Sequence, residues 1–212
     1  MKTIAFEGID GCGKTTQCTL LYEKFRENPS ICLYRYTDRD NFWGRVLKKA
    51  YDTSSRSILR YLGKPKTIQE LLYAFSARAN LKKAGASENS TILADRSIVT
   101  AYASHLNILP EWYINLIEPK LIPDTVVYLD LNPFEGLQRI ATRENKYRDE
   151  DLESMIEFRN AYLQILYKKR PKSLEKTKFH FIDSRGTIDS VHREIMGKLE
   201  HELTYVPELA RS

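Results

Sequence analysis

The sequence has few cysteines and no long apolar run. It contains three cysteines, Cys12, Cys18 and Cys32, and no two of them have C-x-x-C spacing. This odd number argues against a disulfide framework and against a zinc site. No stretch of about 18 apolar residues occurs, so we expect no membrane-spanning helix. The N-terminal stretch MKTIAFEGID also lacks the pattern of a secretory signal, and we therefore expect a cytoplasmic protein.

The sequence also lacks internal repeats, low-complexity linkers and a massed block of basic residues. The formal net charge is +5, which alone would allow a nucleic-acid partner. Because the basic residues are spread along the chain, a solvated surface with a pocket for a phosphorylated small molecule is favoured, with no nucleic acid and no membrane as partner. We interpret residues 1–212 as one domain of ordinary composition.

Short β-rich runs alternate with longer amphipathic stretches along the chain. The runs are continuously apolar and do not alternate strictly, as is typical of strands buried on both faces of a parallel sheet. The alternation predicts an α/β doubly wound fold. The expected strands are 2–8, 30–36, 90–96, 124–131 and 178–183, and the expected helices between them are 15–27, 67–84, 132–143 and 149–170.

The segment from Gly8 to Thr15, GIDGCGKT, matches the phosphate-loop pattern G-x-x-x-x-G-K-[ST]. It follows an expected strand and opens an expected helix, which is the context that supports the match. Glycines let the backbone N–H groups turn inward, Lys14 supplies a movable charge, and the Thr15 hydroxyl is a ligand for Mg²⁺. The pattern predicts a nucleoside triphosphate with magnesium. The predicted binding residues are Gly8, Ile9, Asp10, Gly11, Cys12, Gly13, Lys14, Thr15 and Thr16.

Two residues of this loop have two interpretations each. Asp10 is a carboxylate in a loop for polyanions; it either contacts a second substrate or stabilises the turn. Cys12 is either a small tolerated side chain or a thiol whose pKa is lowered at a helix N-terminus.

The third expected strand ends in Asp95-Arg96, where an α/β sheet presents residues to ligands. A carboxylate there can organise a metal ion, and a guanidinium can fork onto a phosphate; the alternative is an ordinary ion pair. Two basic clusters follow other elements. The first, Arg35, Arg39 and Arg45, is either functional or a solvated helix face. The second, Arg139, Arg143, Lys146 and Arg148, is typical of a lid over phosphates, at about residues 143–151.

Taken together, the motifs resemble the thymidylate kinase family over nearly the whole chain. The resemblance rests on FEGIDGCGKTTQ, LLYAFSARANL, ADRSIVTAYA, PDTVVYLDLNPFEGLQRI, YRDEDLESMIEFRNAYLQI and FIDSRGTIDSV, in the family's order. It implies the P-loop NTPase fold, a three-layer αβα sandwich with a five-stranded parallel sheet and a short Arg-rich lid. It further implies transfer of the γ-phosphoryl group of ATP, with Mg²⁺, to dTMP to give dTDP and ADP in dTTP biosynthesis, and a homodimer.

The resemblance also implies individual roles. Asp10 would accept a hydrogen bond from the acceptor's 3′-hydroxyl, and Tyr162 would lie near its deoxyribose. Lys14, Asp95 and the lid residues Arg143 and Arg148 would be catalytic, with Thr15 and Asp95 at the metal. Arg39 and Arg96 would bind the acceptor phosphate, and Arg78 and Phe75 would contact the base. The donor would be bound by Arg143, Ser184 and Arg185, the last two followed by Gly186.

Three departures from the family pattern lie on the acceptor side. Ser97 follows the Asp-Arg pair where an aromatic residue is usual, and Ala74 stands where a Phe usually stacks on the base. The usual Glu-Pro-Gly-Gly segment is absent. Either Phe75 or Tyr73, which flank Ala74, stacks on the base from a shifted place, or the base pocket is wider; both residues are also candidates for the core. These changes leave open another acceptor (dUMP, UMP or a nucleoside), and a nucleotide-binding regulator without turnover remains the non-enzymatic alternative.

Overall fold

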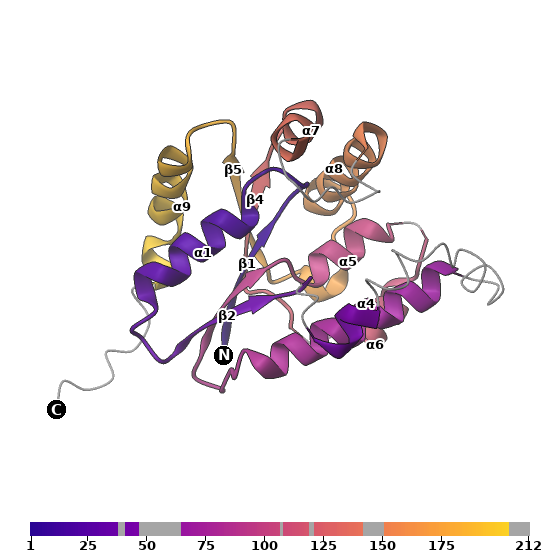
Figure 1. Cartoon of the computed structure of the whole chain (residues 1–212), viewed down its shortest axis with the longest axis horizontal. Coiled ribbons are helices and arrows are strands. Elements are labelled where there is room, and N and C mark those ends of the chain that lie inside the picture. The colour runs from indigo at the N-terminus through magenta and orange to yellow at the C-terminus, as the bar shows by residue number, and fades with distance from the viewer. Residues whose placement is uncertain (38–40, 47–64, 107, 119–120, 142–150, 204–212) are drawn as a thin grey trace.

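The protein is built on a five-stranded sheet in which all strands are parallel and run in the order β2-β3-β1-β4-β5 (Figure 1). The computed structural model describes residues 1–37, 41–46, 65–106, 108–118, 121–141 and 151–203. The strands are β1 (Lys2–Glu7), β2 (Ile31–Arg35), β3 (Thr91–Asp95), β4 (Thr125–Asp130) and β5 (Lys178–Asp183).

Helices cover both faces of this sheet and form the outer layers. In Figure 1, α1 and α9 lie on one side, and α4, α5, α6 and α8 lie on the other, with α7 near the carboxyl ends of β4 and β5. The helices are α1 (Lys14–Phe25), α4 (Pro65–Lys83), α5 (Ile98–Ser104), α6 (Glu111–Ile117), α7 (Pro133–Ala141), α8 (Leu152–Tyr167) and α9 (Ile188–Leu203), with a 3-10 turn at η1 (Lys172–Leu174).

The central strands contribute side chains to two apolar cores, one on each face of the sheet. Successive side chains of a strand point to opposite faces, so Ile4 and Phe6 of β1 face α1 and α9 while Ala5 faces the α4, α5 and α8 side. Val126 and Val127 of β4 divide in the same way. All five are fully buried, which explains why the strands read as continuous apolar runs in the sequence.

The predicted α/β fold with a five-stranded parallel sheet is confirmed. Each expected strand is present, and its observed ends differ from the prediction by at most one residue. The four expected helices are α1, α4, α7 and α8; α8 begins after Asp151, whose carboxylate accepts a hydrogen bond from the Ser154 N–H. The sequence analysis missed α5, α6 and α9. Residues 143–150 of the expected lid, with Arg143 and Arg148, and Arg39 lie outside the described residues.

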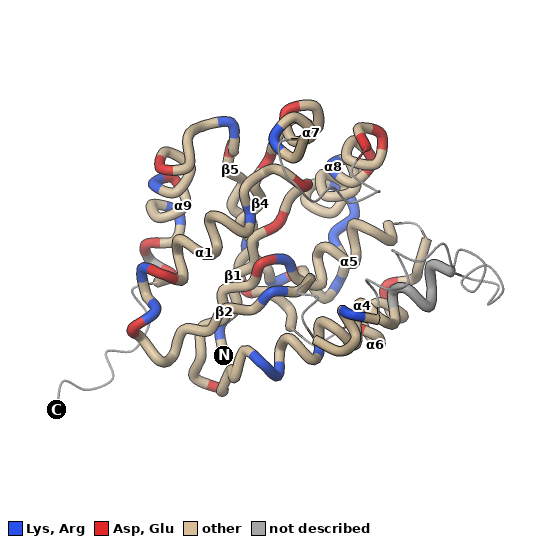
Figure 2. Tube along the Cα trace, in the orientation of Figure 1, with Lys and Arg blue, Asp and Glu red and all other residues tan. Residues whose placement is uncertain are grey.

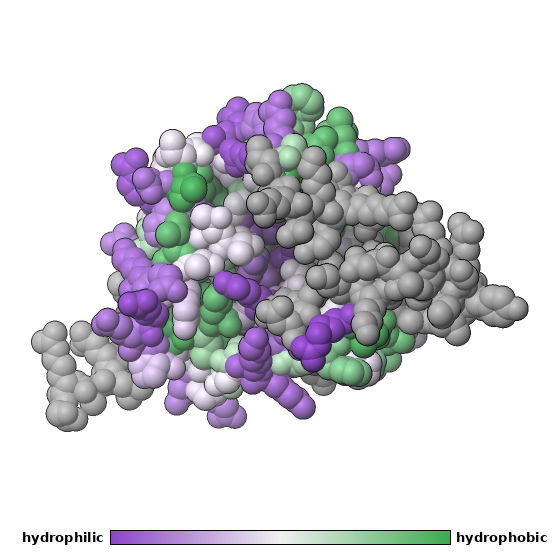
Figure 3. Space-filling view, in the orientation of Figure 1, coloured by the Kyte–Doolittle hydropathy of each residue, from purple (hydrophilic) through white to green (hydrophobic). Residues whose placement is uncertain are grey.

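Charges of both signs are interspersed along the trace (Figure 2). The face seen in Figure 3 is mostly hydrophilic over α1 and α9, and apolar side chains gather near α4 and α6. None of the helices formed by the described residues is both long and apolar enough to cross a membrane.

A buried carboxylate near the end of α9 fastens that helix to the amino ends of the strands. Glu202 accepts hydrogen bonds from the Thr125 hydroxyl of β4 and from His180 Nε2 of β5, at 3.2 Å for the latter. Lys2 Nζ of β1 lies 3.7 Å from its Oε2. Burial alone would raise the pKa of Glu202, but these hydrogen bonds and the Lys2 charge outweigh it and lower that pKa.

We expect Glu202 to stabilise the fold above its ordinary pKa of about 4.3 and to lose this contribution as the pH falls below that value. Replacement Glu202→Gln should lower the free energy of unfolding by about 1–3 kcal/mol at pH 7, because a buried network loses its charged acceptor. The deficit should shrink at acidic pH. Urea unfolding between pH 3 and pH 7 measures both effects.

Glu194→Gln is the matched control, since Glu194 lies exposed on the same helix. An equal effect of the two variants, or a deficit that grows at acidic pH, would contradict this role of Glu202.

Candidate active site

The loop between β1 and α1 has a backbone that only glycine can provide at two positions. Gly8 and Gly11 have φ values of 139° and 82°. A Cβ atom at Gly8 would lie 2.4 Å from the Leu129 carbonyl oxygen, and one at Gly11 would lie 2.5 Å from the Gly136 carbonyl oxygen of α7. The predicted phosphate loop thus packs against β4 and α7, and Gly8 and Gly11 are required both by torsion and by space.

Lys14 is buried at the base of this loop. Its Nζ donates a 2.6 Å hydrogen bond to the Ile9 carbonyl oxygen and lies 3.7 Å from Asp10 Oδ1. The ammonium group is therefore held by the loop itself, close to where inward-facing N–H groups would receive phosphates.

The two predicted metal ligands are in contact, although 80 residues separate them in the sequence. Thr15 Oγ1 of α1 donates a 2.7 Å hydrogen bond to Asp95 Oδ2 at the end of β3. A hydroxyl oxygen and a carboxylate oxygen at this spacing form a donor set that suits Mg²⁺, which usually binds one or two protein oxygens together with phosphates and waters. The neighbouring Thr16 is exposed.

Asp10 and Arg96 form the second predicted group of the site. Arg96 Nη2 contacts Asp10 Oδ1 as an ion pair, and Arg96 Nη1 lies 3.5 Å from the Gly8 carbonyl oxygen. Burial disfavours the Arg96 charge, but Asp10 and three further acidic groups raise its pKa, so the guanidinium stays protonated. Asp10 keeps 41% of its side chain exposed and remains reachable by a substrate.

Arg96 is held in an unusual backbone conformation. Among the described residues, it is the one that has a positive φ without being a glycine, at 71°. Such a conformation costs about 1–2 kcal/mol and persists only where the surroundings enforce it. Its N–H donates to the Phe6 carbonyl oxygen at 3.1 Å, and the next residue, Ser97, is held by Glu7.

Glu7 is a site residue that the sequence analysis missed. Its carboxylate is fully buried and accepts four hydrogen bonds of 2.7–2.8 Å, from the Ser97 N–H, the Ser97 hydroxyl, the Thr100 hydroxyl and the Tyr162 hydroxyl. Burial raises the pKa of Glu7, opposed by these hydrogen bonds and by the Arg96 charge. A charged residue inside the apolar run KTIAFEG was the available signal.

The side chains of Tyr162 and Ser97 both donate hydrogen bonds to the Glu7 carboxylate. Tyr162 is predicted to lie near a sugar, yet its side chain is fully buried with its hydroxyl on Glu7 and Thr100. Ser97, where the family has an aromatic residue, caps α5 by accepting a hydrogen bond from the Val99 N–H. Cys12 is also buried, and this burial raises the pKa of its thiol, so a lowered thiol pKa finds no support.

At the place expected for the base, Ala74 is buried and Phe75 is 41% exposed on α4. The Phe75 ring stacks on Trp43, with 5.0 Å between centroids and 27° between planes. Arg78, three residues farther along the helix, is exposed and donates to the Leu116 carbonyl oxygen of α6 at 3.1 Å. Phe75 and Arg78 are thus on the same side of α4 and accessible, while Ala74 belongs to the interior.

On the donor side, Ser184 and Arg185 follow β5. Ser184 is buried, and its hydroxyl donates to the Asp130 carbonyl oxygen at 2.7 Å. Arg185 is exposed and forms a bidentate pair with Asp183, whose pKa its hydrogen bonds lower to about 2. Arg139, the first residue of the second basic cluster, lies on α7 and donates to the Ser184 carbonyl oxygen.

Known proteins match this chain over most of its length. A family model described as thymidylate kinase matches residues 6–195. A thymidylate kinase of Leptospira borgpetersenii is 37% identical over 78% of this chain and 82% of its own length. A thymidylate kinase of Caldanaerobacter subterraneus is 32% identical, covering 95% and 96%. A probable thymidylate kinase of Methanococcus maripaludis is 30% identical, covering 93% and 94%.

The loop geometry predicts that two glycine replacements differ in cost. Gly13 has φ 95°, but a Cβ atom added there would meet open space, so Gly13→Ala should cost about 1–2 kcal/mol from strain alone. Gly11→Ala adds a clash with the backbone of Gly136 and should lower the free energy of unfolding by about 1–3 kcal/mol more. Urea unfolding of the two variants measures the difference. Equal destabilisation would show that α7 does not confine the loop.

Proposed function

The chain belongs to the thymidylate kinase family and is therefore a nucleoside-monophosphate kinase, and we propose that it transfers the γ-phosphoryl group of ATP, bound with Mg²⁺, to dTMP. One observation carries the proposal for the site. Asp10, in the middle of the phosphate loop, contacts Arg96 at the end of β3, so the groups proposed for the acceptor directly adjoin those proposed for the triphosphate. A transfer between two bound phosphates requires this adjacency.

The residues have the following proposed roles in transfer. The loop N–H groups and Lys14 hold the donor phosphates, and Thr15 and Asp95 hold Mg²⁺, which neutralises charge on those phosphates when bound. Arg96 and Arg39 bind the acceptor phosphate. An acceptor phosphate is already an anion, so no general base is required, and acceleration comes from alignment and charge stabilisation. The family resemblance adds Arg143 and Arg148 as the arginines at the transferring group.

The acceptor base is proposed to lie against α4, where Phe75 and Arg78 are exposed. Phe75 stacks on Trp43 and would offer its edge or remaining face to a base. Ala74, at the position where the family has a stacking Phe, has no ring to stack on a base, and its side chain is buried. This difference is the reason to test acceptors other than dTMP.

We also propose a homodimer. Trp112 and Leu116, one turn apart on α6, are 67% and 65% exposed. Exposed large apolar side chains on one helix face are typical of an interface.

The activity assay is ADP release from ATP-Mg²⁺ with dTMP, dUMP, UMP, dCMP, AMP, dGMP and thymidine. We expect dTMP to be the preferred acceptor, and we expect Lys14→Met to lower its turnover by about 10²–10³-fold as the charge on the phosphates is lost. Better turnover of another monophosphate would mean that this monophosphate, and not dTMP, is the acceptor. Activity on thymidine but not on dTMP would refute the monophosphate assignment, and ATP binding without ADP release would support a regulator.

The role of Asp10 is tested with an acceptor that lacks the 3′-hydroxyl. For the unmodified protein, KM for 3′-deoxy-dTMP should exceed KM for dTMP by about tenfold or more, since a hydrogen bond to a charged group is lost. Asp10→Asn should reduce this ratio toward one. Asp189→Asn, at an exposed position on α9, is the control and should retain the ratio. A ratio unaffected by Asp10→Asn would assign Asp10 to the turn and to Arg96 alone.

A further inference from the structure

The guanidinium of Arg139 joins backbone groups from the two loops proposed to bind the donor. Its Nη1 and Nη2 both donate to the Ser184 carbonyl oxygen at 3.1 Å. Longer contacts of 3.5 Å run from Nη1 to the Gly11 carbonyl oxygen and from Nη2 to the Arg185 carbonyl oxygen. The phosphate loop and the loop after β5 are therefore bridged by one side chain of α7.

The Ser184 carbonyl is presented to Arg139 in a fixed direction. The Ser184 N–H and hydroxyl both donate to the Asp130 carbonyl oxygen, at 2.9 Å and 2.7 Å. These bonds hold the start of the loop against the end of β4, and the Ser184 carbonyl oxygen accepts from Arg139 instead. A planar guanidinium has several donors in a rigid fork and can serve adjacent carbonyl oxygens at once, which a lysine ammonium matches poorly.

The distance from Arg139 to the phosphate loop is set by close backbone packing. A Cβ atom at Gly136 would lie 2.8 Å from the Asp10 carbonyl oxygen, and one at Gly11 would lie 2.5 Å from the Gly136 carbonyl oxygen. One turn separates Gly136 from Arg139 on α7. α7 therefore packs against the phosphate loop at Gly136, and the guanidinium of Arg139, one turn farther along, contacts Ser184.

We propose that Arg139 is a positioning residue for the donor nucleotide, which fixes the loop at residues 184–186 relative to the phosphate loop. The proposal rests on the proposed function, in which the phosphate loop holds the triphosphate, and on the family resemblance, which implies that residues 184–186 contact the adenine of the donor. A donor that spans both loops needs them at a set separation, whereas a ligand that uses the phosphate loop alone does not. Arg139 thus contributes to binding of the nucleoside part without touching it.

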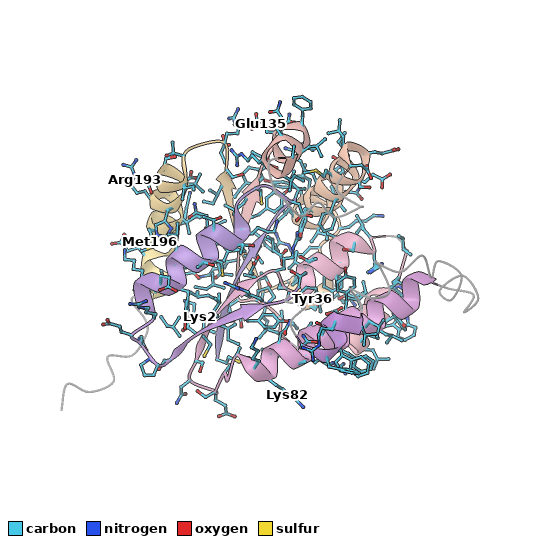
Figure 4. The ribbon with its side chains drawn as sticks, viewed as in Figure 1. Lys2, Tyr36, Lys82, Glu135, Arg193 and Met196 are labelled. Carbon is cyan, nitrogen blue, oxygen red and sulfur yellow. The ribbon has the colours of Figure 1, made fainter. Side chains whose placement is uncertain are left out.

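The test compares ATP-Mg²⁺ with inorganic tripolyphosphate-Mg²⁺ by titration calorimetry, for the unmodified protein, Arg139→Met and Arg139→Lys. Arg139→Met should weaken ATP binding about tenfold, equivalent to about 1.4 kcal/mol. Tripolyphosphate binding should change less than twofold, and Arg139→Lys should recover only part of the ATP affinity. Arg193→Met is the control, because Arg193 is exposed on the outer side of α9 (Figure 4).

Three outcomes would overturn the proposal. Equal weakening of ATP and tripolyphosphate would mean that Arg139 binds the phosphates directly. Unchanged ATP affinity in Arg139→Met would mean that the bridge is dispensable. Full recovery by Arg139→Lys would mean that charge, not the fork, is what matters.

Two further measurements keep the interpretation separate from folding and from the proposed function. Thermal unfolding of each variant shows whether it is folded before binding is compared, and Arg139→Lys serves if Arg139→Met does not fold. The binding measurement contains no acceptor and does not depend on turnover. If the unmodified protein transfers no phosphoryl group, the proposed function is refuted, but the comparison of ATP with tripolyphosphate still decides the role of Arg139.

Discussion

A buried carboxylate, that of Glu7, holds together the three elements around the site. It ends β1 just before the phosphate loop, accepts two hydrogen bonds from Ser97 at the start of α5, and receives the Tyr162 hydroxyl of α8. Ser97 follows Arg96, whose φ of 71° needs an external constraint. By fixing the residue after Arg96, Glu7 also fixes where the Arg96 guanidinium meets Asp10. The position of the Arg96 guanidinium, proposed to bind the acceptor phosphate, therefore depends on a group that is itself fully buried.

The two sides of the site are held in different ways. On the donor side, the phosphate loop, α7 and the loop after β5 meet through backbone atoms: Gly11 against Gly136, and carbonyl oxygens around Arg139. Backbone contacts leave little room for side-chain variation. On the side proposed for the acceptor, contacts between side chains contribute as well, such as Asp10 with Arg96 and Phe75 with Trp43.

The sequence predicted what depends on local pattern and missed what depends on distant partners. The strands were predicted to within one residue because their apolar runs are continuous. Asp95 was singled out by the rule that the carboxyl ends of parallel strands present residues to ligands, and it is in contact with Thr15. α5 was missed because residues from Ile98 to Ala103 are all buried, which leaves no amphipathic period. The partners of Glu7 lie 90, 93 and 155 residues away, beyond the reach of any local pattern.

The cations at the phosphate loop already have internal acceptors. The Lys14 ammonium is held by the Ile9 carbonyl oxygen, and the Arg96 guanidinium by Asp10. An incoming phosphate therefore exchanges with the acceptors of these two cations. Each of the two forms a local dipole with its partner, so its attraction at long range is weak. The Lys14 and Arg96 charges should consequently contribute less to an ionic-strength dependence of nucleotide arrival than the unpaired cations of a bare cationic surface.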